Sequence, residues 1–142
     1  MYHADFEHFK RKSEENWTAS DILEGFVTDT DISRWVNAAA NRAYYAIFQA
    51  ALYFLHRTRS EAYMRNLKLG ESMGSHNIVL KELKQSHLLR QHEQEVKEFN
   101  KMKGLRRKAD YEVEDVHAGL LKANKVQAKA LQELLLTIHS SP

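Results

Sequence analysis

The alternation of apolar and polar positions predicts that the chain is built from helices. From about residue 5 to 25, apolar side chains recur at steps of mostly three and four, the spacing of one helical face, and Gly25 is placed to end that helix. A polar stretch at residues 28–33 follows, in which Asp31 or Ser33 is placed to cap the next helix. The apolar side chains that define the first face are Phe6, Phe9, Trp17, Ile22, Leu23 and Phe26.

The next segment, which runs to about Arg59, is apolar around nearly its whole circumference. Asn37, Asn41 and Gln49 are separated by multiples of four residues and therefore form one thin polar strip. A helix that is hydrophobic on almost every side needs neighbours on most sides. We therefore expect it to be the central helix of a bundle.

The second half of the chain predicts a loop and three further helices. Residues 60–74 contain two glycines and little periodicity, and indicate the longest loop, or a loop with a short helical piece. Ser75 is placed to cap a helix, and after residue 86 another helix is expected to run to about Lys108. A last helix begins between residues 112 and 115. The side chains expected to face inward are Ile78, Val79, Leu80 and Leu83 in the first of these helices, Leu89, His92, Val96, Phe99 and Met102 in the second, and Val113, Val116, Leu120, Ala123, Leu131, Leu134 and Ile138 in the third.

Composition supports an all-α class. The chain has 142 residues, a length typical of one domain, and Pro142 at its end is its only proline, so helix breakers are rare. We expect a single domain over residues 1–142 that folds as an up-and-down bundle of four or five helices. The absence of cysteine excludes disulfides, thiolate zinc sites and a cysteine nucleophile.

The charges are balanced overall and concentrated locally. The 21 basic and 19 acidic residues give a formal charge of +2, so a nucleic-acid contact has to come from a patch. Residues 101–108, KMKGLRRK, hold five cations and no acid. The most apolar segment, residues 43–55, is shorter than the roughly 20 residues of a bilayer span, and the N-terminus does not read as a secretory signal. We expect a cytoplasmic protein without membrane contact, metal or cofactor.

Three short motifs follow one another along the chain: NRAYYAIFQAA at residues 41–51, GSH at 74–76 and RRKADY at 106–111. Together they resemble the HEPN (higher eukaryotes and prokaryotes nucleotide-binding) domain family, in its small stand-alone branch with an RAYYA helix, a central SH and an R..ADY segment. The resemblance covers roughly residues 5–138. It implies a helical bundle, a homodimer, and pairing with a minimal nucleotidyltransferase in a toxin–antitoxin-like system.

For the catalytic branch of that family, the resemblance implies an RNase that uses an Arg followed, after four to six residues, by a His. This chain departs from the pattern, because no Arg has a His at that spacing and the first His after Arg107 is His117. Tyr111 follows Arg106 at a four-residue gap, but a phenol with a pKa near 10 is a poor replacement for an imidazole at neutral pH. The arginines that would neutralise a phosphate are present.

We therefore expect a binding or regulatory module that contacts RNA or a nucleotide through the basic segment and the junction that follows it. Tyr111 is available to stack on a base and, by the resemblance, is a candidate acceptor of a transferred nucleotide. The alternative role of the segment is a solvated helix end whose cations favour the helix dipole. The residues expected to contact RNA or nucleotide are Lys103, Arg106, Arg107, Lys108, Asp110 and Tyr111.

A second set of motif residues is expected to hold the helices together, namely Arg42, Tyr44, Tyr45 and Ser75. Arg42 lies on an apolar helix and needs a partner if buried, for which Asp110 is the candidate, while His76 either packs or takes part in catalysis. Two alternatives to a binding module stay open. One is a metal-independent endoribonuclease in which Arg106 or Arg107 stabilises the transition state and His76 or Tyr111 replaces the missing histidine; the other is a purely structural interaction protein.

Overall fold

The computed structural model describes residues 6–26, 32–69, 74–111 and 117–138. Over these residues the chain forms six α-helices, one short 3-10 helix and no strand, so the predicted all-α class is confirmed. The elements are α2 (Glu7–Glu24), α3 (Ile32–Thr58), α4 (Glu61–Leu67), α5 (Ser75–Gln85), η1 (His87–Leu89), α6 (Glu93–Tyr111) and α7 (Ala118–Thr137).

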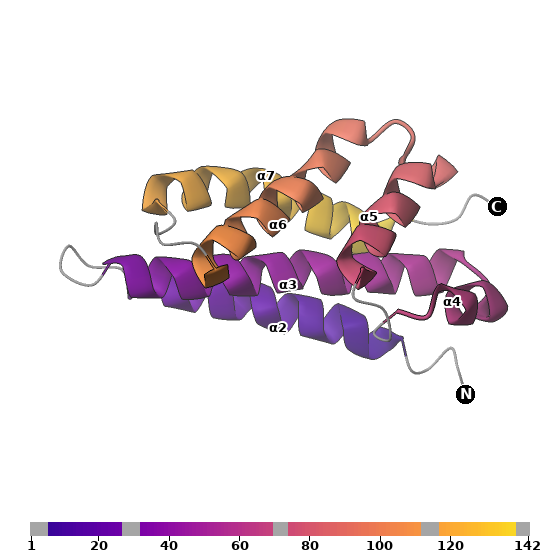
Figure 1. Ribbon diagram of the computed structural model, residues 1–142, viewed down its shortest axis with the longest axis horizontal. Coiled ribbons are helices and arrows are strands. Elements are labelled where there is room, and N and C mark those ends of the chain that lie inside the picture. The colour runs from indigo at the N-terminus through magenta and orange to yellow at the C-terminus, as the bar shows by residue number, and fades with distance from the viewer. Residues whose placement is uncertain (1–5, 27–31, 70–73, 112–116, 139–142) are drawn as a thin grey trace.

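The four long helices α2, α3, α6 and α7 alternate in direction, as an up-and-down bundle requires (Figure 1). Helix α3 lies in the middle and packs against α2, α6, α7 and α5. Its Tyr44, Ile47 and Phe54 are fully buried. The nearly continuous apolar surface of this helix is therefore covered by neighbours, and the predicted central helix is confirmed.

The buried hydrophobic side chains form one cluster around α3. Removing each large apolar side chain from water stabilises the fold by about 1.5–3 kcal/mol. The largest fully buried apolar side chains are Tyr44, Phe54, Phe99, Ile47, Leu55, Leu83, Met102, Leu121, Leu131 and Leu135.

Two serine hydroxyls of α2 donate hydrogen bonds to backbone carbonyls of the central helix α3. Ser13 Oγ donates to the Ala46 carbonyl at 2.6 Å, and Ser20 Oγ donates to the Ala39 carbonyl at 2.7 Å. From α7, Gln132 Nε2 donates to Ser13 Oγ at 2.9 Å. These polar groups are buried, and each hydrogen bond offsets the cost of removing them from water. The three helices thus share one buried polar network.

A buried ammonium joins α7 to α2. The side chain of Lys125 is 6% exposed, and its Nζ lies 2.6 Å from Asp21 Oδ1 and 2.5 Å from Glu24 Oε1. The same ammonium lies 4.9 Å from the centre of the Trp17 ring. We call Lys125, Asp21 and Glu24 the α2–α7 ion cluster. A charge this deep is tolerated because two carboxylates and an aromatic face surround it.

Helix α6 differs from its prediction at both ends. It begins at Glu93 rather than soon after residue 86, and Leu89 lies in the preceding 3-10 helix. Glu93 and Glu95 in the first turn suit the positive end of the helix dipole. The helix then continues past Lys108 through Tyr111, where a junction was expected. No Gly or Pro interrupts residues 106–111, so nothing in that stretch ends the helix.

Helix α7 begins later than predicted. Its N-cap is His117, whose Nδ1 accepts a hydrogen bond from the Gly119 backbone N–H at 3.1 Å, and its first residue is Ala118. The imidazole thereby satisfies one of the free N–H groups of the first turn.

The inward face of α7 also differs from the apolar pattern. Leu120 is 46% exposed, and Ala123 is exposed as well. Of the predicted inward residues, Leu131 is buried, and Leu134 and Ile138 are partly buried against the core. The other buried positions are Leu121, Lys125, Ala128, Gln132 and Leu135. Two polar residues occupy this face because the ion cluster and the buried serine network receive them. The predicted inward residues Val113 and Val116 lie outside the described residues.

The remaining predictions, of helix ends, caps and inward residues, are confirmed only in part. Gly25 does end α2, but Ile22 and Phe26 are 57% and 54% exposed rather than inward. Helix α4 is the short helical piece predicted within residues 60–74. Ser75 is the first residue of α5 and not its cap, because Gly74 holds the N-cap position and makes no side-chain cap. The caps proposed at residues 31 and 33 fall outside the described side chains.

Candidate functional site

Residues from three separate helices meet at one place on the bundle. Tyr44 Oη on α3 lies 2.5 Å from His76 Nδ1 on α5. Arg106 on α6 donates through Nη2 to Tyr45 Oη at 3.4 Å, and its guanidinium carbon lies 5.8 Å and 5.5 Å from the centres of the Tyr44 and Tyr45 rings. We call Tyr44, Tyr45, His76, Lys103 and Arg106 the motif site. It brings together the RAYYA, SH and R..ADY segments.

Aromatic packing fixes the two hydrogen-bonded side chains. Tyr44 is fully buried, and its ring meets the Phe99 ring edge-on at 5.6 Å. The His76 imidazole lies against the Phe48 ring at 4.4 Å between centres. Such contacts contribute about 0.5–1.5 kcal/mol each beyond simple burial. The Tyr44–His76 pair is thus held by the core of the bundle.

The protonation states at the motif site follow from burial and charge. Burial raises the pKa of Tyr44, and the positive charge of Arg106 offsets this only in part, so the phenol stays protonated. Burial lowers the pKa of His76, and the charges of Arg106 and Lys103 lower it further. Both groups are neutral, and the direction of their hydrogen bond follows the imidazole tautomer. With the ring proton on Nε2, Tyr44 donates to Nδ1; with the ring proton on Nδ1, the imidazole donates to Tyr44 Oη and Nε2 is free to accept a proton.

Cations are crowded at the α6 side of the site. Partial burial lowers the pKa of Lys103, and the charges of Arg107 and Arg106 lower it further. The ammonium donates to Asn77 Oδ1 on α5. Like charges this close disfavour one another, and a bound anion would relieve that repulsion. Arg107 is exposed to solvent and completes this group of three cations.

Two predicted residues at the end of α6 are placed only by their backbone. Asp110 and Tyr111 lie in the last turn of α6, and their side chains are outside the described residues. Arg42 is exposed and donates to Asn16 Oδ1 at 3.3 Å, so it is not the buried arginine for which Asp110 would be a required partner. The proposed pairing of Arg42 with Asp110 stays a prediction.

The contacts of three residues with the motif site were not predicted from the sequence. Phe48 and Phe99 pack against His76 and Tyr44, and Asn77 accepts a hydrogen bond from Lys103. Phe48 stands four residues after Tyr44, a spacing that places both on one face and was available as a signal. The contacts of Phe99 with Tyr44 and of Asn77 with Lys103 join different helices, so no local spacing reveals them.

The chemistry available here is anion binding next to a neutral base. Lys103, Arg106 and Arg107 supply charge for phosphate oxygens, and the imidazole of His76 is a proton acceptor close to neutral pH. Within residues 6–26, 32–69, 74–111 and 117–138, no group of three or more His, Asp or Glu side chains is placed to hold a metal ion. No helix in that part of the chain is long and apolar enough to cross a bilayer.

We expect His76 to titrate below its ordinary pKa of 6.5. The unfolded chain takes up a proton near that pH while the folded chain resists it. The contribution of His76 to the free energy of unfolding is therefore constant above pH 6.5 and falls as pH decreases toward the folded pKa. His56, whose pKa is lowered by burial and by His8, adds to the same fall. An NMR titration of the imidazoles and urea unfolding on either side of pH 6.5 measure both effects.

Two variants separate the causes of the His76 shift. Arg106→Gln should raise the pKa of His76 but leave it below 6.5, because burial is the larger cause. His76→Gln should remove only its own part of the loss of stability in acid, leaving the part that His56 contributes. An acid dependence of unfolding that is the same in His76→Gln as in the wild type would contradict the assignment.

Comparison of the chain with protein-family models, curated proteins and solved structures gave no match. The function of the motif site therefore has to be inferred from its own geometry and charge.

Proposed function

We propose that the protein is a HEPN-like binding or regulatory module that contacts RNA or a nucleotide through the motif site and Arg107. The observation that carries the proposal is the crowding of Lys103, Arg106 and Arg107 beside the aromatic pair formed by Tyr44 and His76. Cations that lower one another's proton affinity are suited to a phosphate, which has the opposite charge and accepts their hydrogen bonds.

The aromatic part of the site supports a nucleotide over a simple anion. Tyr45 and His76 are partly exposed, so the site presents ring surface next to its cations. A base stacked on an aromatic side chain contributes about 1–3 kcal/mol, and such stacking tolerates any base. A ligand with both phosphates and bases would use both halves of the site.

The proposal predicts that Lys103→Gln combined with Arg107→Gln weakens RNA binding about twentyfold at 0.1 M salt, because two phosphate contacts are lost. The measurement is fluorescence anisotropy with a labelled single-stranded RNA of about twelve nucleotides, titrated at several salt concentrations. The matched control is Lys68→Gln combined with Lys122→Gln, which removes two exposed cations elsewhere. Equal affinity of both double variants and the wild type would contradict the proposal and favour a purely structural interaction protein.

A second candidate function is metal-independent RNA cleavage, and one observation favours it. His76 and Arg106 come from different helices, yet the charge of Arg106 acts directly on the imidazole, and burial keeps that imidazole a neutral base. The pair would supply proton transfer and charge neutralisation without the local Arg–His spacing that the sequence lacks.

Cleavage would be tested with purified protein on single-stranded and structured RNA in the presence of EDTA. His76→Gln should then abolish cleavage, a loss of about 100-fold or more for a general base, while RNA affinity changes little. The matched control, His92→Gln, removes a partly exposed histidine that contacts Glu95 elsewhere and should cleave like the wild type. Absence of cleavage by the wild type would leave the binding module as the function.

The partners follow from the family resemblance. The proposal includes a cytoplasmic homodimer paired with a minimal nucleotidyltransferase in a toxin–antitoxin-like system. Sedimentation equilibrium tests the dimer, which should have about twice the chain mass of 16.6 kDa. A species at the mass of one chain would contradict it.

A further inference from the structure

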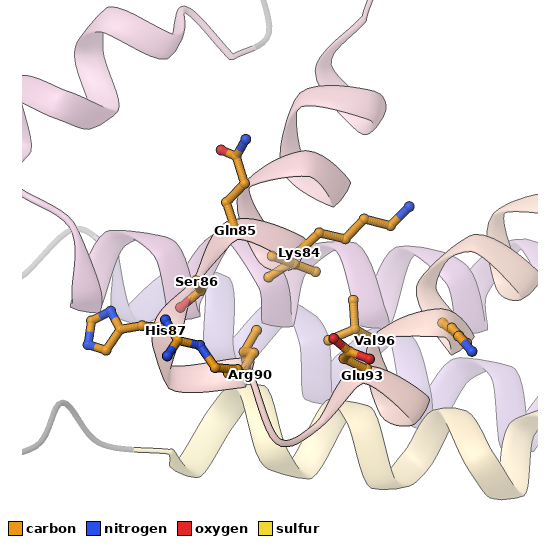
Figure 2. Close-up of a pocket in the computed structure, with 10 residues that line it drawn as sticks. Lys84, Gln85, Ser86, His87, Arg90, Glu93 and Val96 are labelled. Carbon is orange, nitrogen blue, oxygen red and sulfur yellow. The ribbon is translucent and has the colours of Figure 1, made fainter.

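A second, positively charged hollow lies at the opposite end of α5 from His76. It is a cavity of about 480 Å³ where α5 ends, η1 follows and α6 begins. Figure 2 shows Lys84 and Gln85 from α5 on one side of it and Glu93 and Val96 from α6 on the other. The floor is made of Leu83, Ser86, Leu89 and Val96, which are buried. We call this hollow the corner pocket.

The charge of the corner pocket is predominantly positive. Lys84, Arg90 and Lys97 line it and are exposed, while Glu93 is the one acid in the lining. None of these three cations forms an ion pair with another described residue. Other surface cations do pair, as Arg11 does with Glu15 and Arg65 with Glu61. The lining of the pocket therefore carries more positive than negative charge.

The corner pocket and the motif site lie along one seam between α5 and α6. On α5, Asn77, Lys81 and Lys84 are spaced by four and three residues, so they share one face. The hydrogen bond from Lys103 to Asn77 joins the two helices at one end of this seam, and the corner pocket lies at the other. We call the strip of surface that runs from Asn77 and Lys103 to the corner pocket the α5–α6 groove.

Helix α6 contributes a matching row to the groove. Val96, Asn100, Lys103 and Arg107 follow at steps of four, three and four and therefore also share one face. The row starts at the corner pocket with Val96. It ends with Lys103 of the motif site and the neighbouring cation Arg107. The cations of the two rows and of the pocket are Lys81, Lys84, Arg90, Lys97, Lys103 and Arg107.

We propose that this groove binds a single RNA strand whose phosphates contact the corner pocket and the motif site at the same time. The inference rests on the proposed function and makes its ligand a polymer instead of a mononucleotide. From His76 to Lys84, eight helical steps of about 1.5 Å span about 12 Å. A strand can contact both ends only if it carries at least two phosphates, which a dinucleotide with a single phosphate lacks.

The test compares two lengths of single-stranded oligouridine, a dinucleotide with one phosphate and a dodecamer, by fluorescence anisotropy. The groove variant is Lys84→Gln, Arg90→Gln and Lys97→Gln, and the control is Arg11→Gln, Lys68→Gln and Lys122→Gln, each of which removes three exposed cations. For the dodecamer, the groove variant should bind about a hundredfold more weakly at 0.1 M salt, with a salt dependence reduced by about two, because three phosphate contacts are lost. For the dinucleotide, whose single phosphate cannot contact both ends at once, the loss should be at most about fivefold.

The other outcomes distinguish this inference from the proposed function. Loss of dodecamer binding in Lys103→Gln and Arg107→Gln, with none in the groove variant, would overturn the groove and leave the motif site as the RNA contact. If the control variant lost as much dodecamer affinity as the groove variant, the loss would come from the lower net charge alone. That result would also overturn the groove. Equally strong competition by a glutamate dodecapeptide would overturn RNA as the ligand. Failure of the wild type to bind either oligouridine would overturn both proposals.

Discussion

Neutralising both carboxylates that face Lys125 is expected to lower the free energy of unfolding by about 3 kcal/mol. In Asp21→Asn combined with Glu24→Gln, the ammonium keeps its charge but loses the two negative charges that lie within 2.6 Å of it. The Lys125 side chain is 6% exposed, while the Asp21 side chain is 60% exposed, so water screens part of the remaining charge on the Asp21 side. The remaining contact with the Trp17 ring is too weak to compensate for the buried charge. Urea unfolding followed by circular dichroism measures the loss.

A rescue variant tests whether the buried charge is the cause. Adding Lys125→Met to the two carboxylate substitutions removes the charge while keeping a flexible apolar side chain of similar length. We expect this triple variant to recover most of the lost stability, since apolar replacement of buried ion pairs is often neutral. If the triple variant is as unstable as the double variant, the ion cluster stabilises α7 through geometry and not through charge.

Shortening Phe99 is expected to have a similarly large effect and to reach the motif site. Phe99→Ala leaves a cavity in the core and should cost about 3–5 kcal/mol of stability. Because Phe99 packs edge-on against Tyr44, the cavity should also loosen the hydrogen bond between Tyr44 and His76. Loss of that packing admits water, so the pKa of His76 should move up toward 6.5. NMR titration under conditions where the variant is fully folded measures this shift.

A matched cavity elsewhere separates local from global effects. Leu55 is fully buried on α3, eleven residues or about 16 Å along the helix from Tyr44, and Leu55→Ala should cost about 2–5 kcal/mol. It should leave the titration of His76 unchanged. If both cavities shift His76 equally, or if Phe99→Ala shifts it not at all, the packing of Phe99 does not position the pair.

The sequence predicted those elements correctly whose position follows from their own residues. Helix α3 is apolar nearly all round, so any bundle has to place it centrally, and Gly25 marks the end of α2 with a residue that disfavours helix. Helix α7 was harder, since Lys125 and Gln132 occupy its inward face through partners more than a hundred residues away in the chain. A prediction based on apolar residues alone places Lys125 and Gln132 on the solvent-facing side of the helix.

The candidate site shows the same division. The cations of α6 were visible as a run of charges, and the motif resemblance singled out Tyr44, Tyr45 and His76. Their meeting was not visible, because the hydrogen bond between Tyr44 and His76 and the position of Arg106 over the tyrosines depend on how α3, α5 and α6 pack. Residues 32 to 62 positions apart in sequence can be paired only through the tertiary structure.

The origin of the motif site in three helices couples ligand binding to folding. Tyr44, His76 and Arg106 become neighbours only when the bundle is assembled, so the unfolded chain has no equivalent site. A ligand that binds the folded form alone must therefore stabilise it, by about 2.7 kcal/mol at a hundred times its dissociation constant. Separate peptides carrying the three motifs would lack this affinity, and occupancy of the site would register as resistance of the whole bundle to unfolding.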